Sequence, residues 1–321
     1  MQRIFVALCV MVLCLCGCSL ISSGETPDTT IVSAEAEVIA VLPVETEIYV
    51  QEMETEEVEV LNKLEIQDTI ATGYEYQDSD FVMIRDFIPD ALVDLKYAQP
   101  NNFTGHVIYE FNDVYLRYGS VKKLMAVQEE LRSMGLGIKI WDGFRPIAAQ
   151  FKLWEIYPDD TYVANPNVGF SNHSRGFAVD LTLVDAMGNE LVMPTEFDDF
   201  SGKADRNYSD CDPVAAQNAT LLQNLMEKYG FTGYYGEWWH FNDTTRYEVE
   251  YCFDPSMIAT YYADCEEYIA LHVAADTSSD VICWIPASDK FTVFGQSGEF
   301  FLAEYQGWRG YIFSKYALPV A

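Results

Sequence analysis

The sequence predicts an α+β domain followed by a small all-β barrel, with an export signal and an acidic tether in front of them. Three observations support this organisation. Helix-type and strand-type apolar patterns mix between residues 81 and 253, short β-like runs follow one another after residue 267, and an apolar N-terminus leads into a long acidic stretch. Elements of both types around one principal sheet are typical of an α+β fold.

The N-terminus, residues 1–18, has the pattern of a bacterial lipoprotein signal. Arg3 precedes an apolar run from Ile4 to Leu15, and the run ends in Leu15-Cys16-Gly17-Cys18. A charged start, an apolar centre and small residues at the end define a secretory signal. The last four residues resemble a lipobox, at which Cys18 becomes the lipidated N-terminus. We therefore expect an exported lipoprotein on the extracytoplasmic side of the cell membrane; an ordinary signal peptide and an uncleaved anchor are the alternatives.

Residues 19–75 predict a solvated tether. Between Ser19 and Asp68 the stretch is rich in Glu and Asp, and its one basic residue is Lys63. Such a segment repels itself and buries little apolar surface, so we expect it to stay disordered. The whole chain has a formal net charge of -31. This charge excludes nucleic acid as the expected partner, because nucleic-acid binding needs a basic surface.

The α+β domain is predicted at residues 76–255. Its clearest helix runs from Ser120 to Met134, with apolar residues at helical spacing and Gly135 as the stop. The turn Asp142-Gly143-Phe144-Arg145-Pro146 separates a strand from the next helix. The other expected elements are strands at 81–84, 92–95, 137–141, 177–183 and 236–241, and helices at 147–157 and 213–229.

The tail, residues 266–318, predicts a small barrel. Short β-like runs at 269–273, 281–285, 291–294, 300–305 and 310–312 are separated by turn signals. Leu271 and Val273, the pair Pro286-Ala287, and the closing run Gly307 to Ile312 resemble the bacterial SH3-like domain. The resemblance implies cell-wall binding; packing on the preceding domain is the alternative.

Two short segments carry most of the chemistry, Ser171–Leu183 (SNHSRGFAVDLTL) and Gly236–Phe241 (GEWWHF). They contain two of the four histidines of the chain together with an aspartate and a glutamate. A hydrolytic zinc site needs three protein ligands, an open position for water and a carboxylate base. The candidate ligands are His173, Asp180 and His240, and the candidate base is Glu237.

Asp180 is the strongest single indication of a metal. It lies in the apolar strand Phe-Ala-Val-Asp-Leu-Thr-Leu, where an unpaired carboxylate would be costly to bury. A bound cation removes that cost, whereas pairing with Arg175 is the alternative. Glu237 and His240 are three residues apart, and on a regular strand they would face opposite sides. If both reach one metal ion, the chain must turn irregularly between them.

Other polar residues are less specific. Arg145 fits a group that stabilises an oxyanion, and an ion pair with Asp142 is its alternative role. His106 and His272 have no histidine or carboxylate at ligand spacing, so we expect both to be structural. Of the eight cysteines, Cys252 and Cys265 are the nearest pair in the mature chain, and free thiols are equally compatible with the sequence.

Four motifs in order resemble the D-alanyl-D-alanine dipeptidases of the VanX type, within the zinc D,D-peptidase group. They are Asn101-Asn102-Phe103-Thr104-Gly105, the turn at 142–146, Ser171 to Asp180, and Glu237-Trp238-Trp239-His240. The resemblance implies the hedgehog/DD-peptidase-like fold. It also implies one zinc ion on His173, Asp180 and His240, Glu237 as general base and acid, and Arg145 at the scissile carbonyl. Ser171 and Asp142 match positions near the substrate.

The implied activity is hydrolysis of the dipeptide D-alanyl-D-alanine, a component of peptidoglycan metabolism. Two alternatives remain open. The same site could trim longer peptidoglycan peptides as a D,D-carboxypeptidase, a role that the predicted export and tail favour. A zinc-stabilised wall-binding module without turnover is the other, and the presence of Glu237 argues against it.

Overall fold

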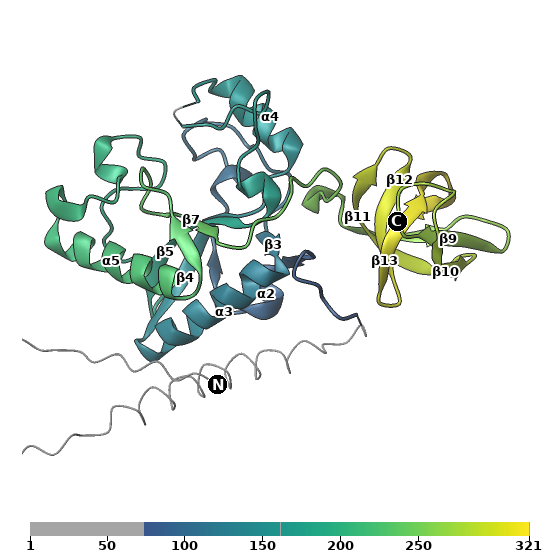
Figure 1. The fold of residues 1–321 in the computed structure, drawn as a ribbon, viewed down its shortest axis with the longest axis horizontal. Helices are drawn as coiled ribbons and strands as arrows, with labels where there is room; N and C mark the ends of the chain where they lie inside the picture. The colour runs from purple at the N-terminus through teal and green to yellow at the C-terminus, as the bar shows by residue number, and fades with distance from the viewer. Residues whose placement is uncertain (1–73, 161, 321) are drawn as a thin grey trace, which may run out of the picture. The chain divides into compact units, whose positions relative to one another are not determined.

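The computed structural model describes residues 74–160 and 162–320 (Figure 1). The predicted signal, its Cys18 and almost all of the predicted tether lie outside the described residues. Within the described part of the chain, no helix combines the length and apolar character needed to cross a membrane.

The first domain is built on a five-stranded mixed sheet with the strand order β2-β4-β5-β7-β6. The strand β2 runs parallel to β4, and the other neighbours are antiparallel. The strands β1 and β3 form a separate two-stranded antiparallel sheet, which has no backbone pairing with the five-stranded sheet. The strands are β1 (Phe81–Met83), β2 (Leu92–Val93), β3 (Tyr115–Arg117), β4 (Leu136–Asp142), β5 (Ala178–Asp185), β6 (Phe231–Gly233) and β7 (His240–Asp243).

Two long helices, α3 (Tyr118–Ser133) and α5 (Pro213–Lys228), cover the sheet (Figure 1). The helix α3 packs against β4, α5 packs against β5 and β6, and the two helices contact each other. The start of α5 follows from its sequence, because the Asp212 side chain accepts hydrogen bonds from the Val214 and Ala215 amides and Pro213 occupies the first turn. The shorter helices are α2 (Ile84–Phe87) and α4 (Ile147–Ile156).

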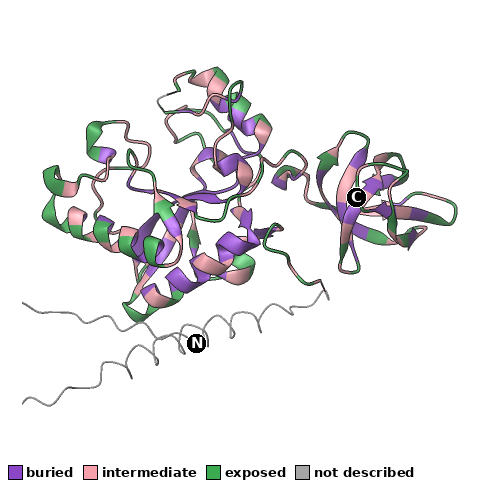
Figure 2. Ribbon diagram, viewed as in Figure 1, coloured by how far each residue is buried: buried purple, intermediate pink, exposed green. Residues whose placement is uncertain are grey.

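The central strand β5 is buried along almost its whole length (Figure 2). Alternation along the strand places Val179, Leu181 and Leu183 on one face and Asp180 and Thr182 on the other. The three apolar residues belong to the main hydrophobic core of the domain. Asp180 therefore lies on the opposite face of the strand from its apolar core residues. It lies near the middle of the sheet because β5 is the third of the five strands.

The second domain is the predicted all-β barrel. Its seven strands follow the order β10-β9-β13-β12-β11-β8-β14 around a core that includes Leu271, Ile285, Val293 and Ile312. The strands are β8 (Ala259–Ala263), β9 (Tyr268–His272), β10 (Val281–Pro286), β11 (Lys290–Ser297), β12 (Phe300–Tyr305), β13 (Trp308–Phe313) and β14 (Ala317–Pro319). The strand β8 lies before the predicted range 266–318, although its Thr-Tyr-Tyr run has the residue types typical of strands.

The predicted fold class, an α+β domain followed by a small all-β domain, is confirmed. One predicted strand, 236–241, is partly wrong, because β7 begins at His240 and turns at 235–236 and 238–239 precede it. The cysteine question is also resolved. Among the described residues Cys211, Cys252, Cys265 and Cys283 are free thiols, so Cys252 and Cys265 do not form a disulfide.

Candidate active site

Three adjacent strands bring the polar residues of the site together. In the sheet register, Asp180 on β5 lies opposite His240 on β7 and opposite Asp142 on β4. His173 comes from a short 3-10 helix (His173–Arg175) that ends at Gly176. Gly176 has a φ of +78°, which a residue with a side chain rarely adopts, and this sharp ending turns the chain into β5.

His173, Asp180 and His240 converge on one point. His173 Nε2 lies 3.4 Å from Asp180 Oδ2 and 3.2 Å from His240 Nδ1, and His240 Nδ1 lies 2.9 Å from Asp180 Oδ1. One ligand atom from each residue lies within 4.8 Å of the others. Two imidazole nitrogens and a carboxylate oxygen are ligands that zinc prefers. The sequence-predicted trio therefore forms one compact cluster.

The outer hydrogen bonds of the two histidines fix their orientation. His173 Nδ1 lies 2.8 Å from the Gly143 carbonyl oxygen, which can only accept, so Nδ1 carries a proton and Nε2 faces the cluster. His240 Nε2 lies 3.2 Å from Asn242 Oδ1, which also accepts from Asn172. The facing nitrogens of the two rings then present lone pairs to each other. A shared cation satisfies both, and such outer partners are usual around metal-binding histidines.

The charges of the trio are strongly coupled. Burial alone would raise the pKa of Asp180, but the charges and hydrogen bonds of His173 and His240 lower it below its usual range. Burial would lower the pKa of His240, and the hydrogen bond and charge of Asp180 raise it instead. Asp180 is therefore ionised at neutral pH, as a carboxylate ligand of a metal must be, and a metal ion would take the place of the proton that Asp180 favours on His240.

Glu237 lies beside the trio without belonging to it. Its Oε2 is 3.7 Å from His240 Nδ1, and its side chain keeps 24% exposure. Burial raises the pKa of Glu237, and the nearby charge of Asp180 raises it further. The irregular chain between Glu237 and His240 that the sequence required is confirmed, because turns separate Glu237 from the first residue of β7.

Arg145 is held by a buried ion pair. Its Nη2 lies 2.6 Å from Asp142 Oδ2, its Nη1 donates to Gln150, and its guanidinium lies over the Tyr97 ring. The Asp142 side chain is fully buried and also accepts hydrogen bonds from the Tyr109 hydroxyl and the Gly143 amide. Burial would lower the pKa of Arg145, and the charge of Asp142 raises it well above its usual value. Both roles weighed for Arg145 are therefore compatible with the structure.

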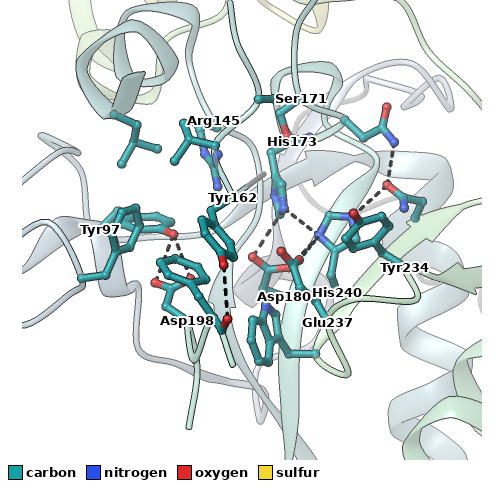
Figure 3. A pocket seen from close by; sticks show the side chains of 18 of the residues that line it. Tyr97, Arg145, Tyr162, Ser171, His173, Asp180, Asp198, Tyr234, Glu237 and His240 are labelled. Carbon is teal, nitrogen blue, oxygen red and sulfur yellow. Dashed lines mark hydrogen bonds and ion pairs between the residues drawn. The ribbon is translucent and has the colours of Figure 1, made fainter. Parts of the chain in front are cut away.

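One cavity of about 260 Å³ contains the cluster (Figure 3). Figure 3 shows His173, Asp180, His240 and Glu237 together at one side, with Tyr97 and Asp198 at the other and Arg145 between them. Ser171 lines the cavity, as expected of a residue near the substrate. Asp142 is absent from the described lining residues and lies behind Arg145, so its contact is with Arg145 rather than with the cavity.

Asp198 is a candidate functional residue that sequence reasoning missed. Both of its carboxylate oxygens accept from the Tyr97 hydroxyl at 3.2 Å, and its backbone has a φ of +59°. Burial raises the pKa of Asp198 well above its usual value, and the charge of Asp180 adds to this. A left-handed conformation at a half-buried acid is unusual, and such conformations cluster at functional sites. In the sequence it was one acid among several in Glu196-Phe197-Asp198-Asp199.

A second cavity of about 300 Å³ adjoins the first. The two cavities share two lining residues, Phe103 and Asp198. Trp141 lines the second cavity, and its buried indole nitrogen has no hydrogen-bond partner among the described residues. Phe103 and Asp198 therefore lie between the active-site cavity and a neighbouring space, and through Phe103 the Asn-Asn-Phe-Thr-Gly motif borders both.

The two tryptophans of the Glu-Trp-Trp-His motif differ in position, and the two histidines expected to be structural lie elsewhere. Trp239 lines the cavity, whereas Trp238 is buried behind it and donates to Thr195 Oγ1 at 2.9 Å. His106 and His272 lie away from the site, with ring nitrogens near the backbone oxygens of Thr104 and Ser279.

The comparisons with known proteins agree with this geometry. A family model described as D-ala-D-ala dipeptidase matches residues 77–254, more than half of the chain, and a bacterial SH3 domain model matches residues 267–317. The chain belongs to this peptidase family, Peptidase_M15. It is therefore a peptidase with a C-terminal bacterial SH3 domain.

Three relatives carry the name D-alanyl-D-alanine dipeptidase. The protein of Escherichia coli K12 is 38% identical over 163 residues, which cover 51% of this chain and 84% of that protein. The Enterococcus faecium protein is 32% identical, covering 50% and 90%, and the Streptomyces coelicolor protein is 32% identical with the same coverage. A solved structure titled as the LdcB LD-carboxypeptidase is 18% identical, with a TM-score of 0.31, and covers 53% of this chain and 70% of that one.

Proposed function

We propose that this chain is a zinc-dependent dipeptidase that hydrolyses D-alanyl-D-alanine. The observation that carries the proposal is the content of one cavity, where a His-Asp-His cluster, a neighbouring glutamate and a separate half-buried acid lie together. Relatives named for this activity, at 30–38% identity, support the choice of substrate.

His173, Asp180 and His240 are the residues that would hold zinc. When bound, the ion supplies a water of lowered pKa, about 7, and polarises the scissile carbonyl. Glu237 is free of the ligand set and lies beside it, so it accepts the proton that the attacking water gives up. The same carboxyl then returns that proton to the leaving amine. Arg145, held in place by Asp142, stabilises the negative charge that develops on the carbonyl oxygen.

The cavity also explains why a free dipeptide fits. A dipeptide carries an ammonium at one end, and the half-buried Asp198 carboxyl is placed to pair with it, because the positive charge would lower the raised pKa of Asp198 and favour its ionised form. A peptide blocked at its amino end lacks that charge and would leave the acid without its partner, at a cost of about 1–3 kcal/mol. Phe103 lines the cavity near Asp198, and we expect its ring to limit the space for further residues of a longer peptide.

The test compares two substrates on the zinc-loaded chain with and without a chelator. D-Alanine release from D-alanyl-D-alanine is expected, with little release from a muramyl-type pentapeptide that ends in the same two residues. The variant Glu237→Gln should lose about 10²- to 10⁴-fold in kcat and keep its zinc. Preferred cleavage of the pentapeptide would make the protein a carboxypeptidase, and zinc binding without any cleavage would make it a binding module.

We propose that the SH3 domain binds the cell wall. Support comes from two exposed aromatic residues on one face of the β9-β10 hairpin, Trp284 and Tyr268, which the register places two residues apart. Exposed aromatic rings stack on sugars and pack on peptides. Co-sedimentation of the chain with isolated peptidoglycan should weaken in the variant Trp284→Ala, and equal retention of both proteins would refute this role.

We also propose an exported lipoprotein anchored through Cys18. The lipobox-like sequence before Cys18 supports the proposal. The variant Cys18→Ser should leave the membrane fraction in a bacterial host, whereas membrane retention of both forms would contradict it.

A further inference from the structure

Three phenylalanines form a cluster directly behind the active-site turn. The ring centroids of Phe81 and Phe253 lie 4.3 Å apart, and the two rings are parallel within 1°. The ring centroid of Phe144 lies 4.4 Å from that of Phe81 and 5.4 Å from that of Phe253. All three are buried. Phe144 belongs to the turn at 142–146, Phe253 to the segment before the SH3 domain. We call these residues the aromatic cluster.

The SH3 domain contributes to the cluster through β11 and β12. Phe294 and Leu302 pack against the three rings. The backbone of residues 252–254 pairs with β11, because Asp254 N donates to Phe294 O at 2.9 Å and Gln296 N donates to Cys252 O at 3.0 Å. Phe253 lies opposite Gly295 in this bridge. The segment that carries Phe253 therefore behaves as a short additional strand of the SH3 domain.

Gly295 permits this pairing. A Cβ atom at this position would lie 1.8 Å from Cys252 O, a separation that no pair of non-bonded atoms tolerates. Any larger residue forces the segment and β11 apart. The position of Phe253 thus depends directly on the absence of a side chain in the SH3 domain.

The turn links the cluster to the catalytic groups. On one side of Phe144, the Gly143 carbonyl accepts the hydrogen bond that orients His173. On the other side, the Arg145 amide donates to the His173 carbonyl at 3.1 Å, and the Arg145 guanidinium faces the cavity. A shift of the Phe144 ring therefore moves a predicted metal ligand and a predicted oxyanion group together. A misplacement of about 1 Å in such groups can cost about 10²-fold in rate.

We propose that Phe253, fixed by β11 through Gly295, is a positioning residue for the active-site turn. The SH3 domain then acts as structural support for catalysis in addition to any role in wall binding. This inference rests on the proposed function for its kinetic readout, but zinc affinity provides a second readout that needs no substrate. Simple core packing predicts a different outcome, namely a lower melting temperature with unchanged zinc affinity and kcat.

The test uses the full chain with two variants and one control. Phe253→Leu keeps an apolar side chain and removes the ring stack, and Gly295→Ala separates the paired segments. The control Ile285→Val trims a fully buried residue of the SH3 core outside the aromatic cluster, and it should lower the melting temperature. Zinc dissociation constants come from chelator competition, and kcat and KM come from D-alanine release.

Both test variants should weaken zinc binding and lower kcat by at least tenfold each, with KM within threefold of wild type, while Ile285→Val changes neither zinc affinity nor kcat. Zinc affinity and kcat within twofold of wild type in Phe253→Leu, despite a lower melting temperature, would overturn the proposal. If Gly295→Ala does not fold, Phe253→Leu alone decides. A wild-type chain that binds zinc but leaves the dipeptide intact would refute the proposed function, and zinc affinity would still decide the positioning role.

Discussion

The buried ion pair between Asp142 and Arg145 gives the sharpest prediction for this site. Asp142 Oδ2 lies 2.6 Å from Arg145 Nη2, and its other oxygen accepts from the Tyr109 hydroxyl at 2.7 Å and from the Gly143 amide at 2.9 Å. The variant Asp142→Asn keeps the shape of the side chain and removes its charge. The guanidinium of Arg145 then stays buried without a counter-ion.

The expected loss of stability follows from that burial. The Asp142 side chain is fully buried and that of Arg145 is 9% exposed, so solvent screens the pair little. Removing one partner of a buried pair costs about 3–5 kcal/mol. Because about 1 kcal/mol corresponds to roughly 2–4 °C in a domain of this size, we expect a melting temperature lower by about 6–20 °C. The activity should also fall, since Arg145 loses its position at the cavity.

A surface pair and a double variant complete the experiment. Asp78→Asn removes an exposed acid that pairs with Lys122 on the surface, and it should cost less than about 1 kcal/mol. Adding Arg145→Met to Asp142→Asn removes the unpaired charge, so stability should recover in part while activity stays low. Differential scanning calorimetry and dipeptide hydrolysis measure the two effects. Asp142→Asn melting within 2 °C of wild type with full activity would refute this account of the pair.

Three further predictions concern the cavity walls and the SH3 domain. Phe103→Ala joins the two cavities and should increase the hydrolysis of tripeptides relative to the dipeptide by at least tenfold, whereas Phe200→Ala, which enlarges the first cavity only, should not. Asp198→Asn removes the charge that meets the substrate ammonium, and its KM for the dipeptide should rise about 10- to 150-fold, the equivalent of about 1.5–3 kcal/mol. The hydrogen bond to Asp289 raises the pKa of Tyr305 to about 12, so the protonated tyrosine stabilises the folded SH3 domain below pH about 10, and this stability is lost as pH rises towards 12. Unfolding midpoints at pH 9 and 11.5 should show a smaller pH effect in Tyr305→Phe, and an equal effect in both proteins would exclude this assignment.

The metal ligands were predictable because burial makes their residue types unusual. A carboxylate inside an apolar strand has few explanations, and Asp180 lies on the central strand as its sequence indicated. The chain has only four histidines, and two of them, His173 and His240, have a carboxylate a few residues away. This spacing distinguished them from His106 and His272. The irregular turn before His240 also followed from geometry, since Glu237 could not reach the same cluster along a regular strand. The strand predicted over 236–241 was nevertheless too long. The apolar residues Trp238 and Trp239 are of a type common in strands, but they lie in the turn before His240.

Asp198 and Tyr97 could not be found in this way. Their sequence neighbours carry no periodic signal, and Asp198 is part of an exposed-looking acidic run. The pairing of Tyr97 with Asp198 joins residues 101 positions apart, so only the fold brings them together. Such long-range contacts are a property of packing, and no local pattern encodes them.

The turn at 142–146 unites these observations, because three consecutive residues each hold a different part of the site. Asp142 binds Arg145, the Gly143 carbonyl orients His173, and Phe144 packs on Phe253 and hence on the SH3 domain. Substitutions on separate elements should therefore act through the same residues, 142–146. Their effects on the free energy of unfolding should not be additive. In a double-mutant cycle, Asp142→Asn and Phe253→Leu should show a coupling energy of about 0.5–3 kcal/mol, whereas Asp142→Asn and Ile285→Val should add within about 0.5 kcal/mol. Additivity in both cycles would mean that the ion pair and the aromatic cluster support the turn independently.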